Sequence, residues 1–220
     1  WKVPQIGKAT RLDLYGEAGK AVRECETVVA VMGINKSIER EGQDRYDIQL
    51  PADQREFLQE IYKVNPNIIL VLVAGSSLAV NWENEHLPAI VNAWYPGEQG
   101  GTAVAEVLFG DYNPAGRLPL TYYKSLEQLS TFDDYDITKG RTYQYFKKDV
   151  LYPFGYGLSY TTFKYSNLKV DDAGKTVNVS FTLKNTGKRA GDEVAQVYVR
   201  LPEIAGGTQA IRQLKGFRRV

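Results

Sequence analysis

Hydrophobic residues in the first half of the chain follow two alternating spacings, which predict alternating helices and strands. Apolar side chains recur at helical spacing within residues 53–64, and residues 17–24 form a shorter helical stretch. Residues 27–32 and 68–73 are instead continuous apolar runs that are rich in β-branched side chains. Such runs are typical of parallel strands that are buried on both faces. A helix followed by a strand is therefore expected twice in this part of the chain.

A third repeat follows the first two. Residues 87–93 form a shorter apolar run, and residues 101–109 have the composition of a helix that ends at Gly110. Residues 118–121 are a candidate fourth strand. Alternating helices and buried strands imply crossover connections between parallel strands. We therefore expect an α/β fold with a mostly parallel sheet sandwiched by helices.

The hydrophobic pattern changes twice in the second half of the chain. Residues 123–163 have no regular period and are dense in tyrosine, which indicates an ordered linker packed on the preceding domain. Apolar and polar side chains then alternate within residues 177–183 and 197–201, as in strands with one buried face. An immunoglobulin-like β-sandwich needs about seven strands, so the sequence predicts only the beginning of one. The expected division is an α/β domain at 1–122, the linker, and a partial β-sandwich at 164–220.

Composition and charge argue against several classes of protein. The 27 basic and 26 acidic residues nearly balance, and no Lys/Arg run exceeds two residues, so no nucleic-acid partner is expected. The longest apolar run, residues 68–74, is far shorter than the roughly 20 residues of a membrane span. Cys25 is the single cysteine and is expected to be a structural thiol, and the sole histidine, His86, is expected on the surface or in a hydrogen bond. Because the chain starts with Trp1 and not with methionine, we expect that an upstream leader or domain has been removed.

In an open parallel sheet, ligands bind beyond the carboxyl ends of the strands. The loops at that edge are expected at residues 33–50, 75–85 and 94–101. The first loop is the longest and contains the charged run Ile-Glu-Arg-Glu-Gly-Gln-Asp-Arg. Either Glu39 or Glu41 within this run could serve as a general acid.

The same charged run contains residues that could shape the loop. Asp44 and Arg45 could fix it by forming an ion pair, and Gly42 permits a backbone turn that a side chain would hinder. The alternative is a solvated charged loop without chemistry, since mixed acids and bases are common on loops.

A series of motifs occurs in one order along the chain. They are the charged loop with Leu-Pro-Ala-Asp-Gln (33–45, 50–54), Tyr-Pro-Gly-Glu-Gln-Gly-Gly (95–101), Val-Leu-Phe-Gly-Asp (107–111), Asn-Pro-Ala-Gly-Arg-Leu-Pro (113–119), Pro-Phe-Gly-Tyr-Gly-Leu-Ser-Tyr-Thr (153–161) and the segment 185–199. Together these motifs resemble the second domain of family 3 glycoside hydrolases and the start of its fibronectin type III-like domain. Residues 38–41 and 140–145 look more like the β-xylosidase and arabinosidase branch of the family than the glucosidase branch.

The resemblance implies the C-terminal part of a retaining exo-glycosidase that hydrolyses β-xylosides or arabinosides of plant polysaccharide, without metal or cofactor. In this family a preceding (β/α)8 barrel carries an aspartate nucleophile, and the second domain brings the acid/base glutamate to the mouth of the barrel. No barrel is recognised in this sequence, so the chain alone is expected to be inactive on an oligosaccharide or xyloside. The acid/base role falls on Glu41, which aligns most directly with the family's Glu-Gly-x-Asp-Arg run, and Glu39 is the competitor.

Residues of the first and third loops could contact the sugar. Arg45 and Asp44 belong to the acid/base motif. Trp94, Tyr95 and Glu98 follow the third expected strand, where aromatic rings could border the apolar face of a sugar. A structural role is the favoured alternative for these three, because the turn and the helix start need the neighbouring glycines and Trp94 could fill the core.

Other functions remain open at this point. A β-glucosidase of the same family is one alternative. A non-catalytic carbohydrate-binding or interaction fragment is another; a degraded acid loop would favour it, but Glu39, Glu41, Asp44 and Arg45 are all present. A nucleotide-binding α/β domain would show a glycine-rich turn directly after the first strand, which the segment 33–37 lacks. Location in a periplasm or outside the cell is implied by the family resemblance alone.

Overall fold

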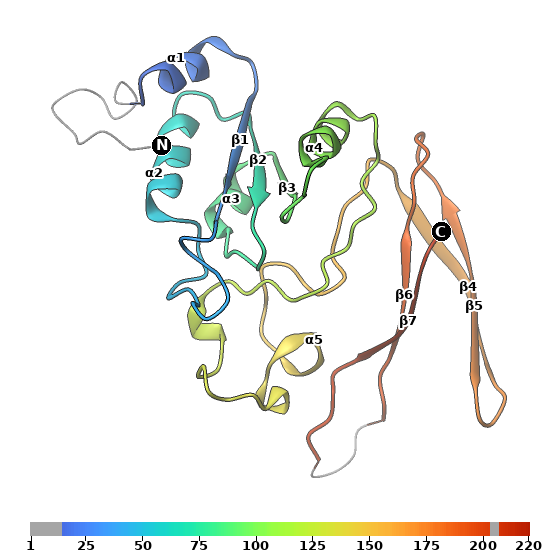
Figure 1. Ribbon diagram of the computed structural model, residues 1–220. Helices are drawn as coiled ribbons and strands as arrows, with labels where there is room; N and C mark the ends of the chain where they lie inside the picture. Colours follow the sequence, from blue (N-terminus) through green and yellow to red (C-terminus); the bar gives the residue numbers. More distant parts are fainter. Residues whose placement is uncertain (1–14, 203–206) are drawn as a thin grey trace. The chain divides into compact units, whose positions relative to one another are not determined.

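The computed structural model describes residues 15–202 and 207–220 (Figure 1). The first 14 residues of the expected α/β domain and residues 203–206 of the expected β-sandwich lie outside the described residues. Contacts between residues divide the chain into two compact units. The first comprises Trp1–Gly101, Thr121–Tyr135 and Lys148–Tyr152, and the second comprises Thr102–Leu120, Asp136–Lys147 and Pro153–Val220.

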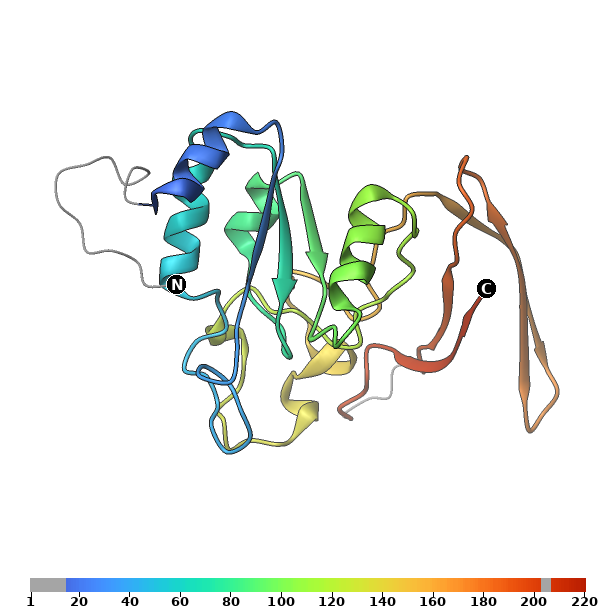
Figure 2. The same ribbon diagram turned by 45° about the horizontal axis from the view of Figure 1, so that its top comes forward.

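The first unit is built on a parallel sheet of three strands in the order β1-β2-β3. Helices precede or separate the strands, and Figures 1 and 2 show α1 and α2 on the same side of the sheet. In chain order the elements are α1 (Glu17–Glu24), β1 (Val28–Gly33), α2 (Ala52–Tyr62), β2 (Ile68–Val73), α3 (Asn81–His86) and β3 (Ala89–Asn92). The expected α/β class with a parallel sheet and helices is confirmed.

The core of this unit lies between the helices and the central strand. Leu58 and Ile61 of α2 are fully buried, as are Ile68 and Leu70 of β2. The helix places Leu58 and Ile61 three residues apart, which puts them on one face. Burying side chains of this size contributes roughly 1.5–3 kcal/mol each, so this contact is a large part of what holds α2 on the sheet.

The outer strand β1 differs from the central strand. Ala30 of β1 is buried, but Val29 and Val31 on the opposite face are 47% and 64% exposed. The expectation of burial on both faces is therefore wrong for β1, while every residue of β2 is at least partly buried. A run of β-branched residues specifies the extended backbone, but it does not reveal whether the second face is covered.

Two local predictions differ from the structure. Residues 118–121 form no strand, although Leu118 forms backbone hydrogen bonds with Gly155 and Tyr156 and an isolated bridge joins Tyr122 to Tyr152. Pro119 has no N–H group to give to a ladder, which explains why apolar character alone is not enough there. Conversely, Asn81–His86 forms α3 within a segment expected to be a loop. Its residues are mostly polar, so it has no apolar periodicity to detect.

Glu83 is a buried acid of α3 that the sequence pattern did not single out. Its side chain is 2% exposed, and its Oε1 atom has no hydrogen-bond partner among the described residues. Burial raises the pKa of the Glu83 carboxyl, while its own backbone N–H and the charges of Arg55 and His86 oppose part of that increase. A carboxyl whose pKa is higher in the folded than in the unfolded chain makes the folded state more stable when it is protonated than when it is ionised.

We expect Glu83 to make the stability of the chain depend on pH. Because the pKa is raised in the folded state, its contribution is fully present below the pKa of an unfolded glutamate and is lost as the pH rises through the folded value. The free energy of unfolding should fall with a slope of up to about 1.4 kcal/mol per pH unit from this group. Urea unfolding between pH 4 and pH 8 should show this slope in the native chain but not in Glu83→Gln. The exposed Glu85→Gln is the matched control, and parallel curves for all three proteins would contradict the prediction.

The second unit consists mainly of two antiparallel strand pairs, β4 with β5 and β6 with β7. The sequence pattern indicated β5 and β6 but missed their partners. The elements are α4 (Gly100–Phe109), which starts in the first unit, then α5 (Thr142–Tyr145), β4 (Phe163–Asp172), β5 (Val177–Asn185), β6 (Val194–Val199) and β7 (Gln213–Arg219). Antiparallel pairs after the parallel sheet confirm the expected change of fold class.

The apolar face of β5 is less covered than the alternating pattern suggests. Val177 and Val179 are 59% and 37% exposed, so the expectation of a dry face is wrong for this end of the strand. Elsewhere the unit is better packed. Tyr143 stacks on Phe154 with ring centroids 4.2 Å apart, and its hydroxyl accepts a hydrogen bond from the backbone of Leu214. Along the described ranges, no helix is long and apolar enough to cross a membrane.

Candidate functional site

Loops of the first unit meet at the carboxyl edge of the parallel sheet. The backbone N–H of Ile34 donates to the carbonyl of Val73 at 3.0 Å, which joins the loop after β1 to the end of β2. The N–H of Ala93 donates to the carbonyl of Leu72 at 2.8 Å, which joins the loop after β3 to the same strand. The three loops selected from the sequence therefore start side by side at one edge, as parallel pairing requires.

Gly33 lies at the point where the first of these loops leaves the sheet. Its N–H donates to Oε1 of Gln54 and its carbonyl accepts from Nε2 of the same side chain, both at 2.8 Å. Its φ is 154°, and a Cβ atom at this position would come within 1.8 Å of the Val73 carbonyl oxygen. The close approach of two backbones therefore requires glycine here.

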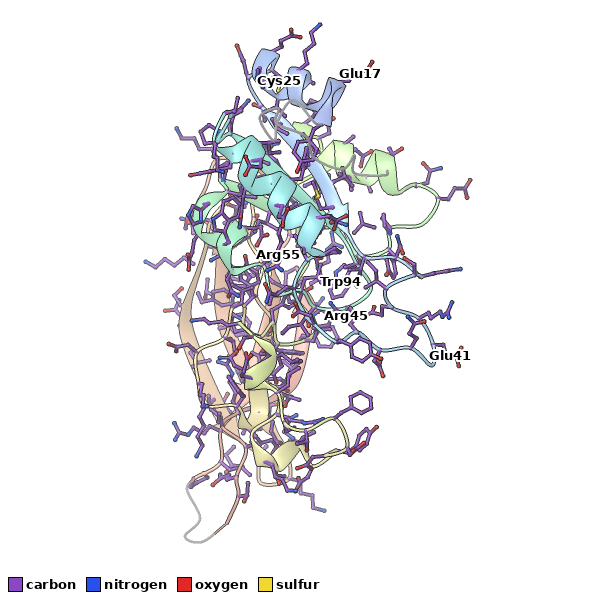
Figure 3. The ribbon with its side chains drawn as sticks, turned by 90° about the vertical axis from the view of Figure 1, so that its left-hand side faces the viewer. Glu17, Cys25, Glu41, Arg45, Arg55 and Trp94 are labelled. Carbon is purple, nitrogen blue, oxygen red and sulfur yellow. The ribbon has the colours of Figure 1, made fainter. Side chains whose placement is uncertain are left out.

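The charged loop forms a tight turn that carries Glu41. Arg40 and Gln43 exchange two backbone hydrogen bonds of 3.1 and 3.0 Å, so Glu41 and Gly42 are the two central residues of the turn. Gly42 has a φ of 72°, which fits the third position of a type II turn. Figure 3 shows Glu41 at the outer end of this loop, while Arg45 and Trp94 lie closer to the body of the unit.

Glu39 and Arg45 form an ion pair below the turn. Nε of Arg45 lies 2.8 Å from Oε2 of Glu39, and their side chains are only 9% and 24% exposed. The Ser76 hydroxyl donates to the same carboxylate oxygen. Nη2 of Arg45 donates to the Ser76 hydroxyl at 2.7 Å and to the Ser77 carbonyl at 3.0 Å. The loop after β1 is thereby tied to the loop after β2.

The structure thus distinguishes the two candidate acids. The carboxylate of Glu39 is engaged by the guanidinium of Arg45 and the hydroxyl of Ser76. Glu41 is exposed, and its side chain forms no hydrogen bond or ion pair within the part of the chain that the structure describes. Asp44 is also exposed, and the ion pair of Arg45 forms with Glu39 and not with Asp44.

The aromatic candidates lie in the loop after β3. The hydroxyl of Tyr95 donates to the Ile34 carbonyl at 3.5 Å, and its ring covers Gly75 so closely that a Cβ there would come within 2.4 Å of it. Tyr95 nevertheless remains 54% exposed. Trp94 is half-buried and has a φ of 55°, a left-handed conformation that is costly for a non-glycine residue. Glu98 is exposed on the following turn, and no hydrogen bond or ion pair among the described residues joins it to this group.

Two residues of this edge were not singled out by the sequence. Ser76 links Glu39 to Arg45, and Gln54 holds Gly33. Ser76 belongs to a loop that the strand-end rule had selected, and Gln54 belongs to the Leu-Pro-Ala-Asp-Gln motif, so position pointed to both. Their hydrogen bonds reach 37 and 21 residues along the chain, which no local pattern reveals.

The remaining polar candidates have structural surroundings. Nδ1 of His86 lies 2.8 Å from the Trp82 carbonyl, and its ring stacks on Trp82, as expected for a hydrogen-bonding histidine. Cys25 is exposed, and its thiol is 3.8 Å from the Val22 carbonyl. No group of three metal-ligating His, Cys, Asp or Glu side chains occurs among the residues that could be searched, 15–202 and 207–220.

Comparison with known proteins places this geometry in context. The model of the glycosyl hydrolase family 3 C-terminal domain matches residues 7–160. The xylan 1,4-β-xylosidase of Xylanibacter ruminicola is 45% identical over 216 residues, covering 89% of this chain and 25% of its own length. The periplasmic β-glucosidase of Salmonella typhimurium is 36% identical, covering 94% of this chain and 29% of its own length.

Solved structures agree with these sequence relationships. The family 3 β-glucosidase of Bifidobacterium adolescentis superimposes with a TM-score of 0.85 at 32% identity, covering 98% of this chain and 34% of that chain. The chain thus spans about a quarter to a third of the length of these relatives. The family resemblance carried by the motifs is confirmed.

Proposed function

Because the chain belongs to glycosyl hydrolase family 3 and corresponds to its C-terminal domain, we propose that it is the acid/base part of a retaining exo-glycosidase. Glu41 protonates the departing glycosidic oxygen while a carboxylate from another part of the full-length enzyme attacks the anomeric carbon. Glu41 then removes a proton from the water that cleaves the covalent glycosyl intermediate. No step needs a metal or an organic cofactor.

The observation that carries this proposal is the contrast between the two glutamates of one loop. A general acid must reach the proton acceptor on a substrate, so it needs an accessible carboxyl group. Glu41 is exposed at the tip of a defined turn, whereas Glu39 is occupied by Arg45 and Ser76. This difference supports Glu41 as the acid/base residue and leaves Glu39 a structural role.

For the substrate we propose a β-xyloside or an arabinoside released from plant polysaccharide. The support is the 45% identity to a protein named xylan 1,4-β-xylosidase. A β-glucoside is the second candidate, supported by the 36% identity to a periplasmic β-glucosidase and by the superposition on another β-glucosidase. Trp94 and Tyr95 are proposed to border the bound sugar or its leaving group, and the exposed Asp44 and Glu98 to supply polar contacts.

The partner that completes the site is proposed to be a (β/α)8 barrel with the nucleophile, present elsewhere in the full-length protein. The relatives are three to four times as long as the matched segment, which supports the presence of further domains. We further propose an acid/base domain at 1–122, a linker at 123–163 and part of a fibronectin type III-like domain at 164–220. The end of the family match at residue 160 and the start of antiparallel pairing at Phe163 support the second boundary. Export to the periplasm or the cell exterior is proposed because one relative is named periplasmic.

Hydrolysis assays with and without the rest of the enzyme test this function. We define the exchange protein as the Xylanibacter ruminicola xylosidase in which the aligned segment is replaced by this chain. The exchange protein should hydrolyse aryl β-xyloside, and the chain alone should hydrolyse none of the substrates. The full-length protein to which this chain belongs should hydrolyse aryl β-xyloside or aryl α-arabinofuranoside faster than aryl β-glucoside. Turnover by the chain alone would mean that it holds a complete site and would refute the proposal. A preference of that full-length protein for the glucoside would select the second candidate.

A further inference from the structure

We propose that Arg45, Glu39 and Ser76 form a clamp that positions Glu41 without taking part in the chemistry. This clamp, defined by these three residues, rests on the proposed acid/base role of Glu41. The sequence suggests Glu39 as an alternative acid, and Arg45 as a sugar contact or an ion-pair partner of Asp44. The three side chains contact one another and join two loops of the same unit.

The clamp closes the base of the turn. Glu39 precedes the turn formed by residues 40–43, and Arg45 follows it, so their ion pair joins the two arms of the loop. Arg45 and Glu39 also share the hydroxyl of Ser76, and Arg45 reaches the Ser77 carbonyl. Ser76 and Ser77 follow β2, the central strand of the sheet. The turn is thus anchored to the most buried strand of the unit.

On either side of the turn, Ile38 packs against the core and the Ala79 N–H donates to the Ile48 carbonyl, but among the described residues few contacts reach residues 40–43 themselves. The turn's own backbone pairing is a single isolated bridge between Arg40 and Gln43, outside any sheet. An isolated two-stranded hairpin is marginal in water, and this one is far shorter. The ion pair below it is largely shielded from solvent, and removing one partner of such a pair leaves an uncompensated charge. Order at the tip, where Glu41 lies, therefore depends on the clamp.

The geometry of the clamp requires arginine. Nε and Nη2 of Arg45 are used at the same time, one toward Glu39 and the other toward Ser76 and Ser77. A guanidinium presents these donors in a fixed planar fork, whereas lysine has one ammonium on a flexible stem. Arg45→Lys keeps the charge but should hold only one side of the loop. Its effects should lie between those of the native protein and those of Arg45→Met.

The first test measures the turn in this chain directly, so it does not depend on any activity. Amide hydrogen exchange is followed at the N–H groups of Arg40 and Gln43, which close the turn. In Arg45→Met both should exchange about ten times faster or more, because the turn opens more often. Arg40→Met is the matched control, since it removes an exposed positive charge from the same loop and leaves these backbone bonds in place. Equal exchange in the two variants would overturn the clamp.

The second test measures the consequence for catalysis in the exchange protein. A displaced acid should hinder only the substrates that need protonation, because misplacement of about 1 Å can cost about 100-fold. In Arg45→Met, kcat/KM for phenyl β-xyloside should fall about 10- to 100-fold, and kcat/KM for 2,4-dinitrophenyl β-xyloside should change less than about 3-fold. Arg40→Met should leave both values unchanged. Equal losses on the two substrates would overturn the positioning role and indicate a contact to the sugar.

Ser76→Ala keeps the test decisive if Arg45→Met fails to fold. This variant removes one member of the clamp and leaves the ion pair in place, so it should show the same leaving-group pattern at about 3- to 10-fold. Glu41→Gln is measured beside it. Leaving-group dependence in Glu41→Gln, but none in Arg45 or Ser76 variants, overturns the clamp alone. Absence of leaving-group dependence in Glu41→Gln refutes the proposed acid/base role of Glu41, while the amide hydrogen-exchange experiment still decides whether the clamp holds the turn.

Discussion

Replacing Glu41 by alanine in the exchange protein should remove most hydrolysis of phenyl β-xyloside, yet spare the first step on 2,4-dinitrophenyl β-xyloside. Phenolate is a poor leaving group and needs a proton from the acid, whereas dinitrophenolate departs without one. General acid catalysis typically contributes 10²–10⁴-fold, so kcat/KM for the phenyl substrate should fall by about that factor. For the dinitrophenyl substrate it should fall less than about 10-fold. Steady-state kinetics with both substrates measures the difference.

Azide provides a second measurement on the same variant. Without Glu41, water attacks the glycosyl intermediate slowly, because no base removes its proton. Azide is already an anion, so it can displace the enzyme carboxylate from the anomeric carbon and form a glycosyl azide without a base. It should raise kcat for the dinitrophenyl substrate in Glu41→Ala and release a β-configured glycosyl azide.

Glu39 supplies the control for this assignment. The Glu39→Gln variant weakens the ion pair with Arg45, so it should show a smaller loss on the phenyl substrate and no acceleration by azide. If azide accelerates a Glu39 variant and not Glu41→Ala, the acid/base residue is Glu39 and the role moves by two positions. This outcome would contradict the interpretation that Glu39, held in an ion pair, positions the loop while the exposed Glu41 takes part in the reaction.

Hydrophobic periodicity predicted the helices and strands of the first unit better than it predicted which of their faces are buried. The expected helix at residues 17–24 has the observed bounds, and the strand at 68–73 coincides with β2. The local sequence is enough to predict these elements, because their apolar side chains face one core and recur at regular spacing. Exposure of Val31 on β1 and the helix at Asn81–His86 were not predictable in the same way. The exposure of Val31 depends on which elements cover that face of the sheet. The helix at Asn81–His86 depends on tertiary contacts around polar residues.

The candidate site was predictable in place but not in detail. The strand-end rule located all three loops, because it depends only on the direction of parallel strands. It left Glu39 and Glu41 equivalent, since both lie on one charged loop. Two partners of Glu39 distinguish it from Glu41: Arg45 of the same loop, and Ser76 of another loop 37 residues along the chain. Side-chain hydrogen bonds across such distances follow from the folded backbone, so sequence spacing cannot supply them.

The largest expected effect on stability comes from Gly33→Ala. The new Cβ would lie 1.8 Å from the Val73 carbonyl oxygen, and this neighbour is backbone, which cannot rotate away as a side chain can. Either β1 and β2 must separate at their ends or the loop must leave the sheet differently. We expect the free energy of unfolding to fall by about 3 kcal/mol, which urea denaturation of the chain measures.

Gly101→Ala is the matched control for this substitution. Gly101 lies in α4, and a Cβ there would meet no atom within 4 Å. Alanine favours a helix over glycine by up to about 1 kcal/mol, so this variant should be slightly more stable than the native chain. Opposite signs for the two substitutions would show that contact geometry, and not the loss of glycine as such, decides the outcome. Similar small changes in both would mean that the end of β1 yields easily, so that Gly33 does not fix where the acid loop leaves the sheet.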